Sequence, residues 1–187
     1  MDLETKRLII RPYATADAMA LYEAKRDSHA ELKMWMDWAQ NPPSLESEQG
    51  TILMFHAKAV AKEELPLAIF RKDTGALVGS GGFRYKSVDV PSFELGYWQA
   101  TAQCGHGFMV EAVKAQTAAL FGPEWGAQRV MVRCHHLNVR SENVMKTCGF
   151  AFEGRLLNAR RHVDGVLAHD LIYAHTPESW SKFSLNL

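Results

Sequence analysis

The segment that decides the fold is Phe93–Ala115, FELGYWQATAQCGHGFMVEAVKA. It starts as a β-type run, passes through a loop that contains Gly105 and Gly107, and ends with apolar residues at helical spacing. Glycines before a helix let a ligand approach the backbone, and the unpaired N–H groups of the first helical turn can bind phosphate oxygens. The segment therefore predicts a strand, a phosphate-binding turn and a helix. A plain glycine turn is the alternative, because a G-x-G pattern alone is not specific.

The residues on both sides of this segment predict an α+β fold. Predicted strands cover residues 7–11, 67–70, 77–85, 93–98, 129–135, 150–160 and 170–175. Predicted helices cover residues 15–30 with Thr15 as N-cap, a segment that starts at Ser44, and residues 108–121 and 141–148. This order predicts a mixed, mostly antiparallel sheet of six to seven strands flanked by about four helices.

The composition is typical of a single globular domain spanning residues 1–187. The chain has 21 basic and 21 acidic residues and is 47% hydrophobic, which argues against disorder and against general nucleic-acid binding. No apolar run reaches the roughly 18 residues of a membrane span, and the N-terminus lacks a secretion signal. Three cysteines are too few for a disulfide framework. We therefore expect a cytoplasmic protein with no nucleic-acid or membrane partner.

No pattern in the sequence predicts a metal site. Cys134, His135 and His136 are adjacent, but neighbouring strand residues point to opposite faces, and no C-x-x-C or H-E-x-x-H pair accompanies them. The run Gly79–Gly82 lacks the lysine of a P-loop and the third glycine of a dinucleotide-binding motif, so it predicts a bent strand.

A second informative segment is Asn138–Phe150, NVRSENVMKTCGF. Asn138 follows a predicted strand, Ser141 opens a predicted helix, and Gly149 is suited to end that helix in the left-handed conformation. A helix-capping role for Asn138 or Ser141 is the simplest interpretation.

Together the two segments resemble the GNAT superfamily of acyl-CoA N-acyltransferases and, more narrowly, its Rim-type ribosomal-protein N-terminal acetyltransferases. The resemblance covers nearly the whole chain and depends on the order and spacing of the motifs. The matching segments are ETKRLIIRPYATAD, FELGYW, GHGFMVEA, NVRSENVMKTCGF and EGRLLNARRHVDGVLAHDLIYA. The resemblance implies transfer of an acetyl group from acetyl-CoA to a primary amine by direct attack in a ternary complex, and it favours a homodimer.

The resemblance also implies which residues bind the co-substrate. In the family, the turn matching residues 104–109 wraps the CoA pyrophosphate with backbone amides, and the strand matching residues 95–98 pairs with the pantetheine arm. The expected cofactor-binding residues are Tyr97, Trp98, Cys104, Gly105, His106, Gly107, Phe108, Met109, Asn138 and Asn143. The family has Gln or Arg in place of Cys104 and a small residue in place of Met109. These departures remove one side-chain contact and predict a more crowded turn.

Glu94 and Ser141 are the candidates for catalysis, because the amine must lose a proton and the departing thiolate needs a donor. Glu94, Gly96 and Trp98 share a face of their predicted strand, so Glu94 is a candidate general base, directly or through water. A salt-bridged carboxylate is the alternative. The Rim-type branch uses a serine at the position of Ser141, and the tyrosine acid of other members is absent. A serine hydroxyl is a poor acid, so we expect Ser141 to hydrogen-bond the leaving sulfur.

Trp35 and Trp38 are the expected substrate-binding residues, because their segment borders the acceptor pocket in the family; core or interface roles are the alternative. The preferred acceptor is a protein N-terminal α-amine, whose pKa of roughly 8 leaves more uncharged amine than the lysine value of about 10.4. A small amine, amino acid or antibiotic is an alternative acceptor. A catalytically silent CoA-binding module is an alternative from another class, supported by the missing tyrosine and by the departures at Cys104 and Met109.

Overall fold

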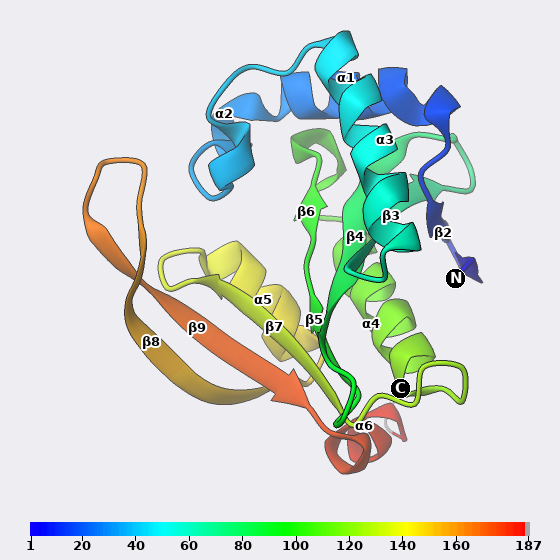
Figure 1. Cartoon of the computed structure of the whole chain (residues 1–187), viewed down its shortest axis with the longest axis vertical. Coiled ribbons are helices and arrows are strands. Elements are labelled where there is room, and N and C mark those ends of the chain that lie inside the picture. Colours follow the sequence, from blue (N-terminus) through cyan, green and yellow to red (C-terminus); the bar gives the residue numbers. More distant parts are fainter. Residues whose placement is uncertain (186–187) are drawn as a thin grey trace.

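The computed structural model describes residues 1–185, which form a nine-stranded sheet with helices on both faces (Figure 1). The strands are β1 (Leu3–Glu4), β2 (Leu8–Pro12), β3 (Glu64–Arg71), β4 (Leu77–Ser87), β5 (Ser92–Leu95), β6 (Trp98–Gln99), β7 (Arg129–His135), β8 (Ala151–Arg161) and β9 (Leu167–His175). The α-helices are α1 (Ala18–Asp27), α2 (His29–Leu32), α3 (Leu45–Val60), α4 (Phe108–Phe121), α5 (Val139–Thr147) and α6 (Pro177–Ser184).

The strands follow the order β1-β2-β3-β4-β5-β7-β9-β8, and β6 also pairs with β4. Neighbouring strands are antiparallel except for β5 and β7, which are parallel. The predicted α+β class with a mixed, mostly antiparallel sheet is therefore confirmed.

Residues 1–185 form nine strands and six α-helices. These numbers exceed the predicted six to seven strands and about four helices. β1 has two residues, too few to show a period of two. The predicted single strand over residues 93–98 is wrong, because Gly96 and Tyr97 separate β5 from β6. The extra C-terminal helix α6 does carry a sequence signal, a capping box of Thr176 and Ser179 with Pro177 at its start.

The first helical segment begins differently from its prediction. Thr15 is not the N-cap, because Ala14 occupies that position. The backbone N–H of Ala14 donates to the Asp17 carboxylate at 2.7 Å, and Arg11 pairs with the same carboxylate at 2.7 Å. The acidic side chain three residues after the cap thus organises this turn. α3, in contrast, follows its predicted cap Ser44.

Alternate residues of the central strands face two helical layers. In β3, Leu67 and Ile69 are fully buried in the core with α4 and α5, whereas Ala68 packs with residues of α1 and α3. The same alternation in β7 directs Val132 to the α4 side. Arg133 therefore lies on the opposite face, the face covered by α1 and α3.

The sheet opens between β6 and β7, and this opening positions the candidate site. β5 pairs with β7 along its whole length, but the following β6 pairs with β4 while β7 continues to His135 beside β9. The two branches converge at one end and diverge at the other (Figure 1). β4 and β6 lie so close that a side chain at Gly79 would collide with the backbone of Trp98. The prediction of a strand through the glycine run is thus confirmed.

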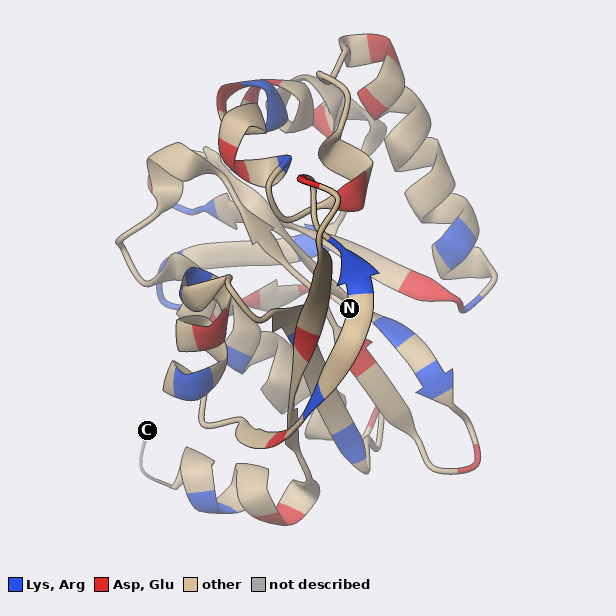
Figure 2. Ribbon diagram, turned by 90° about the vertical axis from the view of Figure 1, so that its left-hand side faces the viewer, with Lys and Arg blue, Asp and Glu red and all other residues tan. Residues whose placement is uncertain are grey.

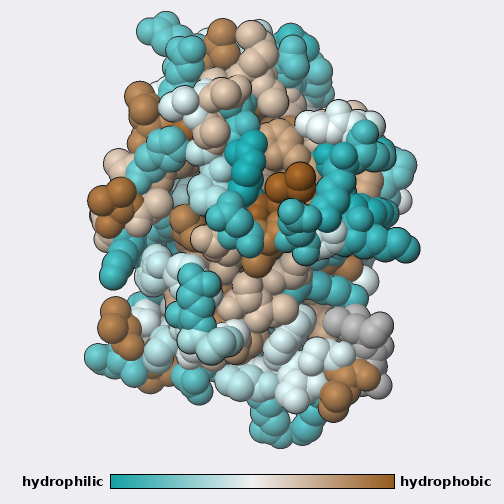
Figure 3. Space-filling model, turned by 90° about the vertical axis from the view of Figure 1, so that its right-hand side faces the viewer, coloured by the Kyte–Doolittle hydropathy of each residue, from teal (hydrophilic) through white to brown (hydrophobic). Residues whose placement is uncertain are grey.

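The surface is mixed in charge and polarity. Basic and acidic residues are interspersed along the helices and strands (Figure 2), as expected from their equal numbers. The face shown in Figure 3 has a hydrophobic group near its centre bordered by hydrophilic residues, and further hydrophobic groups toward its edges. Among residues 1–185, no helix is both long enough and apolar enough to cross a bilayer.

Candidate active site

A cavity of about 680 Å³ lies where β6 and β7 diverge, beneath α1, α2 and α3. It brings together predicted residues that are far apart in the sequence. Those that line it are Trp35, Trp38, Glu94, Tyr97, Trp98, Asn138 and Ser141. The turn of residues 104–109 and Asn143 lie outside this lining.

The glycine turn before α4 has the geometry of an anion-binding loop. Gly105 and Gly107 have φ values of +83° and +73°, which favour glycine. A side chain at Gly105 would meet nothing within 4 Å, and one at Gly107 would meet only the Arg7 guanidinium at 3.7 Å. The space over the turn is therefore open, and the first amides of α4 have no acceptor within the helix.

The two departures from the family pattern do not block this turn. Met109 is 2% exposed and belongs to the hydrophobic core, so its side chain does not crowd the backbone. The Cys104 thiol lies 3.5 Å from the carbonyl of Ala100, within its own loop. The predicted crowding at Met109 is therefore wrong, and the backbone amides of the turn fit a pyrophosphate.

Two arginines border the turn, and the sequence reasoning missed both. Arg7 donates to the His106 carbonyl at 2.9 Å, and its guanidinium lies 4.5 Å from the centre of the Phe108 ring. The Arg71 guanidinium lies 5.2 Å from the same ring. Glu111 pairs with Arg7 at 2.6 Å. Arg7 precedes β2 and Arg71 ends β3. Both are distant in sequence from the turn, so no local motif reveals them, although guanidinium groups beside an amide turn suit a phosphate.

Tyr97 and Ser141 form a hydrogen-bonded pair across the opening of the sheet. The Ser141 hydroxyl donates to the Tyr97 hydroxyl at 3.1 Å, and Tyr97 donates to the Ser141 carbonyl at 2.9 Å. Burial raises the pKa of Tyr97, although its hydrogen bond with Ser141 opposes this rise. Tyr97 is thus a neutral phenol that orients the serine. A tyrosine does reach this helix, but from the link between β5 and β6, and the sequence does not reveal this contact.

Asn138 caps α5, and this role was the simplest interpretation of its position. Its side-chain oxygen accepts from the backbone N–H of Ser141 at 3.1 Å, so α5 begins at Val139 and not at Ser141. Asn138 also lines the cavity. Asn143 is exposed on α5 and is not brought to the other candidates.

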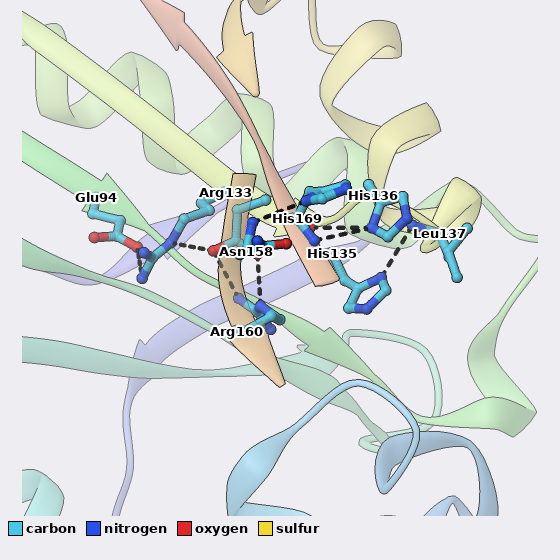
Figure 4. A network of polar contacts seen from close by, with 9 residues as sticks. Glu94, Arg133, His135, His136, Leu137, Asn158, Arg160 and His169 are labelled. Carbon is cyan, nitrogen blue, oxygen red and sulfur yellow. Dashed lines mark hydrogen bonds and ion pairs between the residues drawn. The ribbon is translucent and has the colours of Figure 1, made fainter. Parts of the chain in front are cut away.

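Glu94 lies on the cavity wall within a chain of charges (Figure 4). Its carboxylate is 3.1 Å from the Lys86 ammonium and 3.3 Å from the Arg133 guanidinium. Arg133 also reaches Asp170 at 3.6 Å, and Arg160 binds Asp170 at 2.6 Å. Glu94 is therefore a salt-bridged carboxylate that also faces the cavity, so both of its sequence interpretations describe its surroundings.

His135 is a buried neutral histidine beside the expected acceptor residues. It is 3% exposed, and its Nδ1 accepts from the backbone N–H of Leu137 at 3.0 Å. Burial, followed by the nearby His136, His162 and Arg160, lowers the pKa of His135. The ring of Trp35 packs 5.4 Å away. The buried Nε2 of His135 has no hydrogen-bond partner within residues 1–185.

The cysteines and histidines of this region do not suggest nucleophilic or metal chemistry. Burial, with smaller contributions from Glu142 and Asp170, raises the pKa of the Cys134 thiol to about 12, so this thiol is a poor nucleophile at neutral pH. In residues 1–185, no three His, Cys, Asp or Glu side chains are grouped so that they could hold a metal ion.

Trp35 and Trp38 both reach the cavity, but in different surroundings. Trp35 is half-buried against His135 and lies 5.9 Å from His162. Trp38 is 51% exposed and packs 6.1 Å from Trp98, with Lys25 over its ring. The two tryptophans thus form an aromatic part of the cavity wall.

Comparisons with known proteins agree with this geometry. Residues 7–151 match the family described as the acetyltransferase (GNAT) domain. The chain is 28% identical over 154 residues to an uncharacterized N-acetyltransferase, YnaD of Bacillus subtilis (strain 168), covering 82% of this chain and 85% of the relative.

Solved structures share the fold at low sequence identity. RimL, a ribosomal L7/L12 α-N-protein acetyltransferase in complex with CoA, has a TM-score of 0.86 at 19% identity and covers 96% of this chain and 99% of its own. Mycobacterium smegmatis RimJ, in complex with CoA-disulfide, has a TM-score of 0.82 at 23% identity, and the match covers 96% of this chain and 88% of RimJ. The microcin C7 self-immunity acetyltransferase MccE, in complex with acetyl-CoA and AMP, has a TM-score of 0.84 at 20% identity, and the match covers 92% of this chain and 93% of MccE.

Proposed function

The chain belongs to the GNAT acetyltransferase family, which makes it an acetyl-CoA-dependent acyltransferase, and we propose that its acceptor is the N-terminal α-amine of a protein. The observation that carries this proposal is the cavity that connects the opening between β6 and β7 to the wall of Trp35 and Trp38. A thioester between these strands and an amine from the aromatic side would meet within one enclosed space.

Acetyl-CoA fits the residues that are present. The amides of residues 105–109 would hold its pyrophosphate, with Arg7 and Arg71 beside them. The unpaired edge of β6 and the amide of Asn138 would hold the pantetheine arm. When bound, acetyl-CoA supplies an activated acetyl group, and the remaining chemistry is the handling of protons by the chain.

Two side chains have positions suited to that proton chemistry. Glu94 faces the cavity and can accept a proton from the amine, directly or through water, although Lys86 and Arg133 already share its charge. Ser141 can turn its hydroxyl toward the leaving sulfur, while Tyr97 keeps its own proton because burial raises its pKa. In this proposal the serine stabilises the thiolate by a hydrogen bond and does not protonate it outright.

An α-amine acceptor agrees with this modest base. Its pKa of roughly 8 means that a useful fraction is uncharged near neutral pH, so a salt-bridged carboxylate suffices. A lysine amine, whose pKa is about 10.4, would require a more effective general base than the salt-bridged Glu94. The fold shared with RimL and RimJ supports the same choice.

The test is a thiol-release assay with acetyl-CoA and a panel of amines. We expect release with peptides that have a free N-terminus, and none with the same peptides after N-terminal acetylation, even when they contain lysine. Preference for polyamines, amino acids or aminoglycosides would replace the proposed acceptor but keep the chemistry. Tight CoA binding by calorimetry without release on any amine would indicate the silent binding module.

The proposal includes three further features that stand on the family resemblance and on composition. The chain would act as one domain of residues 1–187, as a homodimer, in the cytoplasm. Light scattering on the purified protein tests the dimer, and fractionation of cells tests the location.

A further inference from the structure

The charges of the cavity wall are unbalanced in favour of cations. The lining contains five basic residues, Lys25, Lys58, Arg84, Arg133 and Arg160, and three acidic residues, Glu48, Glu64 and Glu94. Each acid already has a cation. Glu48 binds Lys25 at 2.5 Å, Glu64 binds Lys58 at 3.0 Å, and Glu94 binds Lys86 at 3.1 Å. A ligand that brings negative charge would therefore complement this wall.

Arg133 makes only long contacts with its acidic partners. Asp170 is 1% exposed and is bound through both oxygens by Arg160, at 2.6 and 3.3 Å. Glu94 is closer to Lys86 than to Arg133. The contacts of Arg133 are long, 3.3 Å to Glu94 and 3.6 Å to Asp170, and its side chain is 36% exposed. Several of its five N–H donors can bind an additional anion.

The position of Arg133 limits how far that anion can lie from the reacting amine. Its guanidinium is 3.3 Å from the Glu94 carboxylate, the candidate partner of the amine, and Figure 4 shows Arg133 between Glu94 and the Arg160 side chain. Two groups bound by such neighbouring side chains are only a few bonds apart in the acceptor. The amine and the anion would thus belong to the same residue.

From this geometry we propose that Arg133 binds a carboxylate on the acceptor residue that carries the reacting amine. The inference rests on the acetyltransferase activity of the proposed function and specifies that the amine acceptor also carries a carboxylate. Two sources share this chemistry, a peptide with an N-terminal aspartate or glutamate and a free α-amino acid. In both, a planar carboxylate meets a planar guanidinium, which favours bidentate binding.

The test compares acceptors that differ in one charge. The tripeptide amides aspartyl-alanyl-alanine and asparaginyl-alanyl-alanine have nearly the same shape. We expect the aspartyl peptide to have a kcat/KM about 10-fold higher, as for one charge-assisted hydrogen bond. A second pair, alanine and alaninamide, compared at equal concentrations of uncharged amine, tests the free amino acid.

Variants then assign the preference to Arg133. In Arg133→Gln, the ratio of kcat/KM between the two acceptors of each pair should be close to one. Arg133→Lys should restore part of the preference for the acceptor with a carboxylate. Arg129→Gln is the matched control, because Arg129 lies on the same strand, pairs with Glu153 and does not line the cavity. Since each ratio is measured within one variant, a general loss of activity cancels.

Each outcome decides a separate question. A preference in only one pair identifies the source of the carboxylate, and equal rates in both pairs overturn the inference while leaving the acetyltransferase intact. If no acceptor releases thiol, the proposed function fails. Calorimetric titration of the same pairs into the CoA complex then tests the inference alone, and equal or undetectable binding of the acidic and neutral partners overturns it.

Discussion

The cofactor side and the acceptor side of the site are built from different parts of the chain. On the cofactor side, residues 104–109 and the start of α4 form one continuous segment that offers backbone amides. On the acceptor side, Trp35, Glu94 and Arg133 come from three separate segments and offer side chains. A backbone site tolerates changes such as Cys104 and Met109, whereas a side-chain site changes its chemistry with each substitution.

This difference predicts that substitutions on the two sides act on different quantities. Changes in the turn should alter CoA affinity for every acceptor. Changes on the acceptor side should alter turnover or the choice of amine and leave CoA affinity unchanged. The following experiments test whether CoA affinity and turnover respond separately to changes on the two sides.

The largest effect is expected for Gly107→Val. A β-branched side chain fits neither the φ of +73° nor the close approach of a pyrophosphate to the turn. Loss of two charge-assisted hydrogen bonds, each worth about 1.5–3 kcal/mol, predicts at least roughly 100-fold weaker binding. Calorimetry of CoA binding measures it.

Gly126→Val is the matched control for this variant. Gly126 has a φ of +57° in the loop between α4 and β7, and a side chain there would meet nothing within 4 Å. It carries a similar backbone strain beyond the C-terminal end of α4, whereas the turn lies at the N-terminal end of that helix. If both variants bind CoA as the wild type does, the turn is not the phosphate site.

The next effect is expected at Ser141, on the border between the two sides. Ser141→Ala should lower kcat by about 10- to 100-fold and leave the KM for acetyl-CoA nearly unchanged, because the hydrogen bond forms to a sulfur that becomes charged only during the reaction. Tyr97→Phe should cause a smaller loss of kcat, since it removes only the group that orients the serine.

The double variant shows whether Tyr97 acts through Ser141. If it does, Ser141→Ala with Tyr97→Phe has the kcat of Ser141→Ala alone. Independent roles would multiply the two losses and contradict the pairing. Tyr85→Phe is the control, because Tyr85 packs against Phe83, Phe93 and Trp125 and does not line the cavity.

The sequence predicts well the elements whose signals are local. α4 and β7 have the predicted bounds, because a clear period is closed by glycine and proline or by the end of the apolar alternation. The glycine turn was also found, since its requirement for positive φ depends only on neighbouring residues. The two-residue strand β1 was not predicted because two residues contain no period. The predicted strand 93–98 is interrupted in the structure, because β5 ends at Leu95 and β6 begins at Trp98.

The acceptor side could not be predicted to the same depth. Tyr97 and Ser141 are 44 residues apart in the chain, and their hydrogen bond exists only because the sheet opens between β6 and β7. The period of two in β7 did place Arg133 on the face of Glu94, so its candidacy could have been noticed. The excess positive charge at Arg133 could not be predicted from the sequence, because it depends on which acidic residues form ion pairs with Lys86 and Arg160.

A smaller effect is expected for Glu94→Gln. Lys86 and Arg133 already share the charge of this carboxylate, so we expect kcat/KM to fall about 10-fold, less than the roughly 10²- to 10⁴-fold typical of an acid–base residue. The acidic limb of the pH profile should also disappear after correction for ionisation of the amine. Glu64→Gln, another salt-bridged carboxylate of the cavity, is the control. Equal profiles for both variants would remove Glu94 as the base.

The smallest effect concerns stability, and it compares a histidine on the acceptor side with a histidine in the core. Burial lowers the pKa of His135 on the acceptor side and of His175 in the core near α6, where a hydrogen bond to the Cys148 carbonyl only partly opposes it. A histidine whose folded pKa lies below its unfolded value stabilises the protein above about pH 6.5, because the unfolded chain takes up the proton first. The free energy of unfolding should therefore fall as the pH drops below that value, by up to about 1.4 kcal/mol per pH unit for each histidine. Urea unfolding between pH 8 and 5 measures this slope, and His135→Gln and His175→Gln should each reduce it. If His175→Gln alone reduces the slope, the acceptor side opens before the core unfolds, and the acceptor side is less stable than the core.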